Sequence, residues 1–340
     1  MTTINRRWIL KSRPTGMPGR DNFELREEPI PVAADGQILV RNLYLSCDPA
    51  QRSWMERDTY VRKIPLGEVM RSGTTAQVIE SKHAGFRAGE LLSGMFGWQD
   101  YAVSDGTGFV PVTKLPRGVP IPLTMSVLGL TGLTAYFCML DICDPQPGRN
   151  ILVSGAAGAT GSIAAQIAKI KGARVVGIAG GAEKCRWLTE DLGLDAAIDY
   201  RAGDVGKQLQ HLFPKGIDGF FDNVGGEVLE AALQNLAPLA KVGLCGAISI
   251  YNDLDHTPPL RNHTRLLVTR ARLQGFLVTD HVAQFSEGAM QLGQWLADGK
   301  LKNQVDVVEG LENAPEAFRR LFTGENLGKQ LVRVAEPASG

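Results

Sequence analysis

Cysteine and histidine are both scarce and scattered in this chain of 340 residues. The cysteines are Cys47, Cys138, Cys143, Cys185 and Cys245, and the histidines are His83, His211, His256, His263 and His281. They form no close-spaced set of ligands of the kind that structural zinc sites use, so we predict no metal. No N-terminal signal with an apolar core precedes the first β-like run, and we expect five small buried thiols in a reducing cytoplasm.

The chain also lacks an excess of either charge. Lysine plus arginine and aspartate plus glutamate each number 36, which argues against a nucleic-acid-binding surface or an acidic tail. The longest uncharged run, Gly118–Leu140, approaches the length of a membrane span, but proline, glycine and hydroxyl residues interrupt it. We therefore expect a buried helix there and no membrane partner. With 44% hydrophobic residues, the chain is long enough for two globular domains.

A glycine-rich turn stands between an apolar strand and a helix in Ile151–Ser162, which reads ILVSGAAGATGS. Apolar residues then recur at helical spacing until Gly172, and a second strand is expected at Arg174–Ala179. Glycines let the backbone approach a phosphate, while N–H groups at the helix start face the anion. G-x-x-G-x-x-G is weaker than the G-x-G-x-x-G fingerprint, and a flexible loop is the alternative. The complete strand–turn–helix–strand unit favours a dinucleotide pyrophosphate site.

The end of the second strand carries no carboxylate. NAD sites usually place aspartate or glutamate there to bind the ribose 2′-hydroxyl. Here Gly180 and Gly181 leave room for a phosphate, Lys184 supplies positive charge, and Glu183 is expected to point to solvent. The pattern predicts NADPH/NADP+ as cofactor, with an ordinary solvated lysine as the alternative for Lys184.

Two domains follow from the order of the predicted elements. Short β-like runs such as Gln37–Leu45 and Thr75–Glu80 fill the first part, whereas strands and helices alternate from Leu123 onward. Later strands are expected at 151–153, 174–179, 196–198, 219–223, 241–245, 273–278, 305–308 and 329–334, with a helix at 285–298. The predicted fold class is α/β, with a β-rich domain at 1–122, completed by 306–340, and a doubly wound parallel sheet at 123–305.

Several short motifs occur in this same order. They are NRRWILKSRPTG, YLSCDPAQRSWM, LGEVMRSG, GLTGLTAY, SGAAGATGS, FDNVGG, CGAISIYN and ENLGKQLV. From about Arg7 to Val334, the chain resembles the prostaglandin reductase, curcumin reductase and 2-alkenal reductase branch of the medium-chain dehydrogenase/reductase superfamily. The resemblance implies a GroES-like N-terminal domain, a Rossmann NADP-binding domain and a homodimer. Leu236–Cys245 and Leu273–Val278 are expected at the sheet edge through which two chains pair.

The motifs resemble the zinc-free members of the superfamily. Zinc relatives carry Gly-His-Glu where this chain reads Leu66-Gly67-Glu68-Val69, and Cys47 lacks partner ligands. Without a Lewis acid, the easier reaction is hydride transfer from NADPH to the β-carbon of an α,β-unsaturated ketone or aldehyde. A quinone reductase and a non-catalytic NADPH-binding protein, such as the superfamily's lens crystallins, are the alternatives. The short-chain dehydrogenase pattern is excluded because none of the six tyrosines has a lysine four residues later.

The resemblance also implies individual site residues. Those expected at the pyrophosphate are Ala157, Gly158, Ala159, Thr160 and Gly161, and those at the 2′-phosphate are Gly180, Lys184 and Tyr200. Those expected at the nicotinamide half are Asn223, Cys245, Gly246, Ala247, Ile248, Ser249, Tyr251, Phe276, Leu277, Val278 and Asn326. The expected substrate residues are Tyr60, Met70, Trp98 and Gln99. Alternatives are a plain turn at Asn223, a cap at Asn326, buried strand positions for Phe276 and Val278, and a core position for Trp98.

Tyr251 is the candidate catalytic side chain. It matches a tyrosine that, in family members, bonds the nicotinamide ribose beside the substrate carbonyl, and a phenol can donate to a developing enolate oxygen. An ordinary exposed loop tyrosine is the alternative. The chain departs from many relatives at Ala50, where they carry tyrosine after Asp-Pro, and this change is expected to widen the pocket or remove a polar contact.

Overall fold

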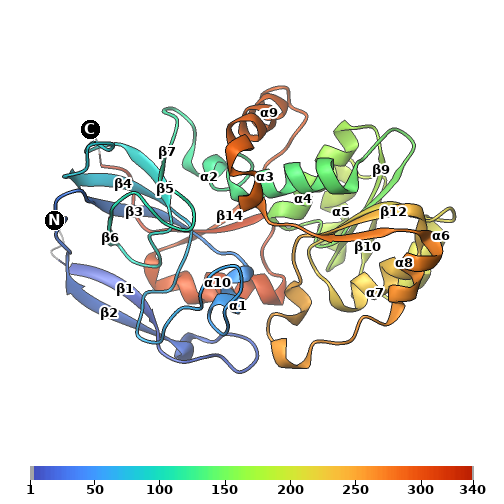
Figure 1. The fold of residues 1–340 in the computed structure, drawn as a ribbon, viewed down its shortest axis with the longest axis horizontal. Coiled ribbons are helices and arrows are strands. Elements are labelled where there is room, and N and C mark those ends of the chain that lie inside the picture. The colour runs from blue at the N-terminus through green and yellow to red at the C-terminus, as the bar shows by residue number, and fades with distance from the viewer. Residues whose placement is uncertain (1–3, 339–340) are drawn as a thin grey trace. The chain divides into compact units, whose positions relative to one another are not determined.

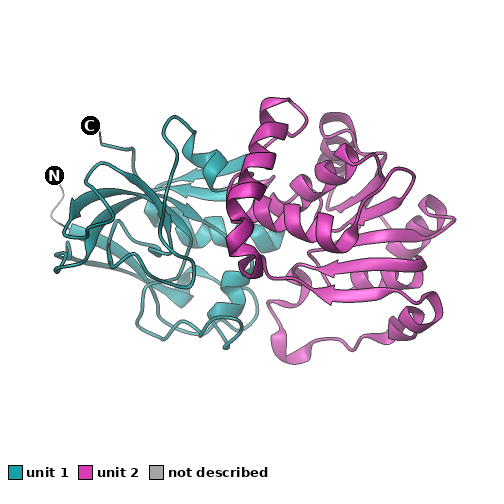
Figure 2. Ribbon diagram, turned by 45° about the horizontal axis from the view of Figure 1, so that its top comes forward, with its two compact units in different colours: residues 1–125, 305–326, 330–340 teal, residues 126–304, 327–329 magenta. Residues whose placement is uncertain are grey.

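The computed structural model describes residues 4–338 and falls into two compact units (Figure 2). Unit 1 comprises residues 1–125, 305–326 and 330–340, and unit 2 comprises residues 126–304 and 327–329. The C-terminal part of the chain therefore belongs largely to the same unit as the N-terminal part.

Unit 1 is β-rich. Its strands are β1 (Ile4–Leu10), β2 (Phe23–Pro29), β3 (Ile38–Ser46), β4 (Thr74–Ser81), β5 (Leu91–Gly94), β6 (Tyr101–Ser104), β7 (Thr113–Lys114), β14 (Val305–Glu309) and β15 (Lys329–Arg333). β1 and β2 pair separately, and the main sheet has the order β14-β15-β3-β4-β5-β7, with β6 also on β3. The helices are α1 (Ala50–Trp54), α2 (Ile121–Thr124) and α10 (Ala314–Thr323). The predicted β-rich architecture is confirmed; the strand expected at 37–45 is shifted by one residue, and the strand expected at 75–80 is one residue longer at each end.

Large aromatic side chains fill the core of unit 1. Trp8 and Trp98 are fully buried, and the Trp98 ring meets Phe318 of α10 edge to face, with 5.7 Å between centroids. The indole N–H of Trp8 donates to the carbonyl of Leu311 at 2.8 Å. These contacts join the C-terminal helix to the N-terminal strands within one hydrophobic core.

Unit 2 is built on a parallel six-stranded sheet. Its strands are β8 (Asn150–Val153), β9 (Arg174–Ala179), β10 (Ala196–Asp199), β11 (Ile217–Asp222), β12 (Leu236–Leu244) and β13 (Arg272–Gly275). Their order is β10-β9-β8-β11-β12-β13, so the chain builds outward first on one side of β8 and then on the other. This is the predicted doubly wound arrangement, in which ligands bind at the carboxyl ends of the strands where the order reverses.

Helices cover both faces of this sheet (Figure 1). They are α3 (Leu130–Phe137), α4 (Ala159–Ile170), α5 (Ala182–Arg186), α6 (Val205–Leu212), α7 (Gly226–Gln234), α8 (Thr264–Thr269) and α9 (Phe285–Ala297). α3 and α4 pack together and α9 packs on α3, while α6 and α7 pair on the opposite side with α8 next to α7. The uncharged run at 118–140 contains α2 and α3. Within residues 4–338, no helix combines the length and hydrophobicity needed to cross a membrane.

Two expected edge strands differ from the structure. β12 begins five residues earlier than expected and lies between β11 and β13, so Leu236–Cys245 is not at the edge. β13 is the edge strand, and it ends at Gly275, opposite Leu244, the last residue of β12; a 3₁₀ turn starts at Val278. Periodicity locates strands along the chain, whereas their order in a sheet depends on which partners the intervening helices allow.

Candidate functional site

The glycine-rich turn lies at the carboxyl end of β8 and leads into α4. Gly155 has φ 57°, a left-handed conformation that favours glycine. A Cβ on Gly161 would lie 2.3 Å from the carbonyl oxygen of Gly155, so only glycine lets α4 pack this close to the turn. Gly158 caps α4, which begins at Ala159 and has no acidic residue in its first turn. The unpaired N–H groups of this first turn form a cradle that suits a pyrophosphate.

A segment near the C-terminus lies beside this turn within unit 2. The N–H of Gly328 donates to the carbonyl of Ala157 at 2.9 Å, and Gly158 and Gly328 form a parallel bridge. Gly328 has φ 68°, and a Cβ there would lie 2.2 Å from the carbonyl oxygen of Gln304. Asn326, expected at the nicotinamide, stands two residues before Gly328 and is buried.

Tyr200 and Gly180 meet at the ends of β10 and β9. The N–H of Tyr200 donates to the carbonyl of Ala179 at 3.1 Å, and a Cβ on Gly180 would come within 2.8 Å of the Tyr200 ring. The Arg201 guanidinium lies 5.7 Å from the centroid of that ring. Arg201 is not among the residues predicted from the sequence, and its position directly after Tyr200 is the signal that points to it.

Lys184 lies on α5, the short helix that follows Gly181. It is half-buried, whereas Glu183 is exposed as predicted. Asp199, the last residue of β10, accepts hydrogen bonds from the N–H groups of Gly181 and Arg201, both at 2.9 Å. These backbone bonds lower the pKa of Asp199. Its carboxylate is therefore engaged in holding the turn after β9 against the end of β10.

The residues expected at the nicotinamide half surround the ends of β11 and β12. The side-chain amide of Asn223 donates to the carbonyl of Ser154 at 2.7 Å, and the Asn223 carbonyl accepts from the N–H of Ile248 at 3.3 Å. The Ser249 hydroxyl donates to the carbonyl of Val224 at 2.6 Å. The segment 245–249 is thus attached to the turn after β11, and Asn223 takes part in that turn.

Tyr251 is a half-buried residue whose phenol oxygen accepts a hydrogen bond from the N–H of Ala247 at 3.1 Å. Burial raises the pKa of the Tyr251 phenol, and the bond from Ala247 lowers it by less. The phenol is therefore protonated at neutral pH and keeps its own O–H as a donor. The alternative of an ordinary exposed loop tyrosine is wrong.

The cysteines divide into two groups. Cys47, Cys138 and Cys143 are buried as expected, but Cys185 and Cys245 are only partly buried as residues. Cys245 follows β12 directly, and desolvation raises the pKa of its thiol to about 12. A thiol beside the expected cofactor segment is thus kept protonated and weakly nucleophilic.

Phe276 and Val278 are neither buried nor in a strand, so that alternative is wrong for both. The N–H of Phe276 donates to the carbonyl of Leu244 at 3.0 Å, just past the last residue of β13. Its ring stacks on His281 with 5.3 Å between centroids. Phe276, Leu277 and Val278 are half-buried and continue the carboxyl end of the sheet.

The expected substrate residues in unit 1 have different surroundings. Trp98 and Met70 are both fully buried in the core, so the core alternative holds for Trp98 and also applies to Met70. Tyr60 is 45% exposed and stacks on Phe109 at 5.7 Å. Ala50 begins α1, which ends at Trp54, and the Trp54 ring meets the Tyr60 ring edge to face with 6.2 Å between centroids.

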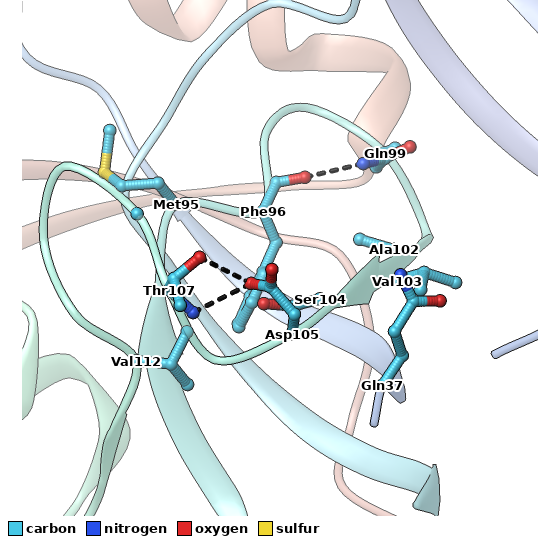
Figure 3. Close-up of a pocket in the computed structure, with 11 residues that line it drawn as sticks. Gln37, Met95, Phe96, Gln99, Ala102, Val103, Ser104, Asp105, Thr107 and Val112 are labelled. Carbon is cyan, nitrogen blue, oxygen red and sulfur yellow. Dashed lines mark hydrogen bonds between the residues drawn. The ribbon is translucent and has the colours of Figure 1, made fainter. Parts of the chain in front are cut away.

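Gln99 lines a surface pocket of about 400 Å³ in unit 1 (Figure 3). Its side-chain amide donates to the carbonyl of Phe96 at 2.6 Å, and on the other side of the pocket Asp105 accepts from the hydroxyl and N–H of Thr107. The pocket is lined by Gln37, Met95, Phe96, Gln99, Ala102, Val103, Ser104, Asp105, Thr107, Gly108 and Val112. Tyr60, Met70 and Trp98 are not among these residues.

Comparison with known proteins identifies the family. Residues 6–112 match the family model for the N-terminal domain of oxidoreductase, and residues 159–295 match the model for zinc-binding dehydrogenase. The chain is 41% identical over 338 residues to the NADPH-dependent curcumin reductase of Escherichia coli (strain K12), with 97% of each chain covered. The chain belongs to the medium-chain dehydrogenase/reductase family.

Further relatives place the chain within this family. Prostaglandin reductase 1 of Bos taurus is 37% identical over 329 residues, covering 96% of this chain and 98% of its own. The crystal structure of CurA in complex with NADPH from Vibrio vulnificus has a TM-score of 0.92 at 40% identity, covering 98% of this chain and all of that one. This medium-chain dehydrogenase/reductase is therefore an oxidoreductase of the curcumin and prostaglandin reductase branch.

The description of the second family model names zinc, but the residues that the structure describes do not fit a zinc site. Among residues 4–338, no three histidine, cysteine, aspartate or glutamate side chains are grouped so that they could hold a metal ion. Cys47, near the first cysteine ligand of zinc relatives, is buried in the aromatic core of unit 1.

Proposed function

We propose that this chain is an NADPH-dependent reductase of the C=C bond of α,β-unsaturated ketones and aldehydes. The observation that carries the cofactor is the acid-free N–H cradle between Gly155 and α4, with Lys184 on the short helix that follows β9 and the neighbouring Glu183 exposed. The reaction class is supported by full-length similarity to a curcumin reductase and a prostaglandin reductase.

Each end of the dinucleotide has its own set of residues in this proposal. The turn residues Ala157–Gly161 bind the pyrophosphate, while Lys184 and Tyr200 bind the 2′-phosphate. Asn223, the segment 245–249, Phe276–Val278 and Asn326 hold the nicotinamide end. When bound, NADPH supplies the hydride that is added to the β-carbon of the substrate.

Tyr251 is proposed to donate its phenol proton in a hydrogen bond to the substrate carbonyl oxygen, where negative charge develops. The raised pKa keeps the phenol protonated at neutral pH, and its oxygen is held by the N–H of Ala247. Preorganised donors of this kind lower the activation barrier by roughly 2.7–4 kcal/mol. We expect Tyr251→Phe to lower kcat about 100-fold with near-normal NADPH affinity, and wild-type turnover in this variant would remove Tyr251 from the role.

The substrate class is tested by NADPH oxidation, followed by absorbance, with one alkenal, one enone, one quinone and one saturated aldehyde. NADH serves as the control cofactor. Turnover of the alkenal or enone with NADPH preferred supports the proposal. Turnover of the quinone alone supports a quinone reductase, and tight NADPH binding without turnover supports a non-catalytic binding protein.

We further propose a cytoplasmic homodimer that pairs through the edge strand β13. α8, which immediately precedes β13, exposes Leu267 and Val268 by 80% and 67%. Apolar exposure next to an open strand edge is typical of an interface. Light scattering at micromolar concentration should give twice the chain mass, and Leu267→Glu should shift the protein to monomer; a monomeric wild-type protein would contradict the dimer. Cell fractionation tests the compartment, and recovery outside the cytosol would contradict it.

A further inference from the structure

Two buried polar side chains lie where the strand order of unit 2 reverses. Ser154 follows β8, Asp222 ends β11, and both are fully buried. β8 and β11 are parallel neighbours with Val153 opposite Phe221, so Ser154 and Asp222 form the next pair toward the carboxyl ends. This position borders the crevice in which doubly wound sheets bind their ligands.

Ser154 and Asp222 are directly bonded. The Ser154 hydroxyl donates to Oδ1 of Asp222 at 2.6 Å and accepts from the N–H of Asn223 at 2.8 Å. Oδ1 also accepts from the N–H groups of Val224 at 3.0 Å and Gly225 at 3.1 Å, and Oδ2 accepts from Gly225 at 3.1 Å. The carboxylate thus fixes the whole turn that follows β11.

No cation of the described residues compensates this carboxylate. Burial raises the pKa of Asp222, and the bonds from Ser154, Val224 and Gly225 oppose that shift. An uncompensated buried carboxylate is costly, so an apolar residue would serve better if only core packing were needed. Core packing therefore does not explain an aspartate at this position, whereas the hydrogen bonds that its carboxylate accepts do.

The turn fixed by Asp222 is hydrogen-bonded to the segment 245–249, which is expected at the nicotinamide and is called the nicotinamide-side loop below. The Asp222 carbonyl accepts from the N–H groups of Cys245 at 2.8 Å and Gly246 at 3.1 Å, and the Val224 carbonyl accepts from the Ser249 hydroxyl. On the other side, Ser154 stands immediately before Gly155, the first glycine of the phosphate turn. The side-chain bond between Ser154 and Asp222, together with the two bonds from Asn223 to Ser154, thus joins the phosphate turn to the loop at 245–249.

We propose that Ser154 and Asp222 are a positioning pair. Their hydrogen bond fixes the position of the phosphate turn relative to the nicotinamide-side loop, so that both halves of NADPH can be bound at the same time. This proposal rests on the proposed function, since it assumes that these two segments hold the two ends of NADPH. It assigns roles to two residues that contact neither the substrate nor the reacting atoms.

The test separates the two ends of the cofactor. Calorimetry on the full chain measures the Kd of NADPH and the Kd of 2′,5′-ADP, which carries the adenosine with its 2′- and 5′-phosphates but lacks the nicotinamide half. We expect Ser154→Ala and Asp222→Ala to weaken NADPH at least tenfold while 2′,5′-ADP changes by less than about threefold. Asp222→Asn retains an acceptor toward Ser154, Val224 and Gly225, so we expect it to remain within about threefold of wild type for NADPH.

Asp218→Ala is the matched control. Asp218 lies on the same strand β11 and its Oδ2 accepts from the N–H of Asn150 on β8 at 2.8 Å, but at the opposite end of the strands. It should lower thermal stability without changing either Kd. If Asp222→Ala does not fold, Ser154→Ala and Asp222→Asn still provide the comparison.

Three results would overturn the positioning pair. The first is an equal loss of affinity for NADPH and 2′,5′-ADP in Ser154→Ala, and the second is no loss of affinity for either ligand. The third is the same loss of NADPH affinity in Asp222→Asn as in Asp222→Ala. Failure of the proposed function is distinguishable from these results. A wild-type protein that binds NADPH but reduces no enone or alkenal overturns the proposed reaction. The ratio of the two Kd values still decides the role of Ser154 and Asp222 in that case.

Discussion

Gly161→Ala adds one methyl group where α4 meets the phosphate turn. The new Cβ would lie 2.3 Å from the Gly155 carbonyl oxygen and 2.9 Å from the Cα of Ala156. The first distance is about 1 Å inside ordinary van der Waals contact. Both neighbours are backbone atoms and cannot swing aside as a flexible side chain would. The start of α4 must therefore move away from the turn.

The size of the effect follows from two opposing terms. Overpacking of this kind costs about 1–3 kcal/mol, whereas alanine in place of a helical glycine returns about 0.5–1 kcal/mol. We expect net destabilisation and a fall in Tm of up to roughly 10 °C for a unit of this size. Because the displaced N–H groups are those of the proposed pyrophosphate cradle, the Kd of NADPH should rise at least tenfold, which is about 1.4 kcal/mol.

Thermal unfolding and NADPH calorimetry on the full chain measure both effects. Gly293→Ala is the control, because Gly293 lies inside α9 and its added Cβ would meet only Leu128, at an ordinary 3.7 Å. That variant should equal or exceed wild type in Tm and bind NADPH normally. A Gly161→Ala protein with wild-type Tm and Kd would refute the close-packing explanation of this glycine.

Three further predictions concern charge and reactivity. Lys184→Ala should weaken NADPH about tenfold and leave NADH unchanged, because a charge-assisted bond to the 2′-phosphate is lost; equal effects on both cofactors in steady-state kinetics would contradict this. The Cys245 thiol, with its pKa raised to about 12, should resist iodoacetamide at pH 8 in the folded chain and react once unfolded, as read by mass spectrometry; rapid native labelling would argue against it. The hydrogen bond from Lys241 lowers the pKa of Asp144 in the folded protein. The ionised carboxylate therefore stabilises the fold fully at pH values above its pKa in the unfolded chain, and this contribution is lost as the pH falls through its lower pKa in the folded chain. Asp144→Asn should therefore reduce stability in urea at pH 7 but much less at pH 3, and an equal loss at both pH values would exclude the ion pair as the cause.

Local pattern was enough to locate most elements. β9 has the bounds expected from the sequence, α9 differs by one residue at its end, and the turn of Gly155–Gly161 lies between β8 and α4 as predicted. These features depend on residues close in the chain: apolar spacing defines a strand or helix, and glycines mark positions that other residues cannot occupy. The family motifs added the reaction class and the expected site residues.

Burial and strand order could not be obtained in this way. A tryptophan suits a pocket wall as well as a core, and only packing against Phe318, 220 residues away in the chain, shows that Trp98 is core. The edge position of β13, rather than β12, is likewise a result of which strands pair.

Short stretches of neighbouring residues specify most of the elements, their order along the chain, the glycine cradle and the family of this protein. The 2.6 Å hydrogen bond between Ser154 and Asp222, which are 68 residues apart, follows from the fold and not from any local pattern. A serine and an aspartate at the ends of two strands have no periodic signature. They meet because parallel pairing of β8 with β11 aligns their carboxyl ends, and that alignment is a property of the folded sheet.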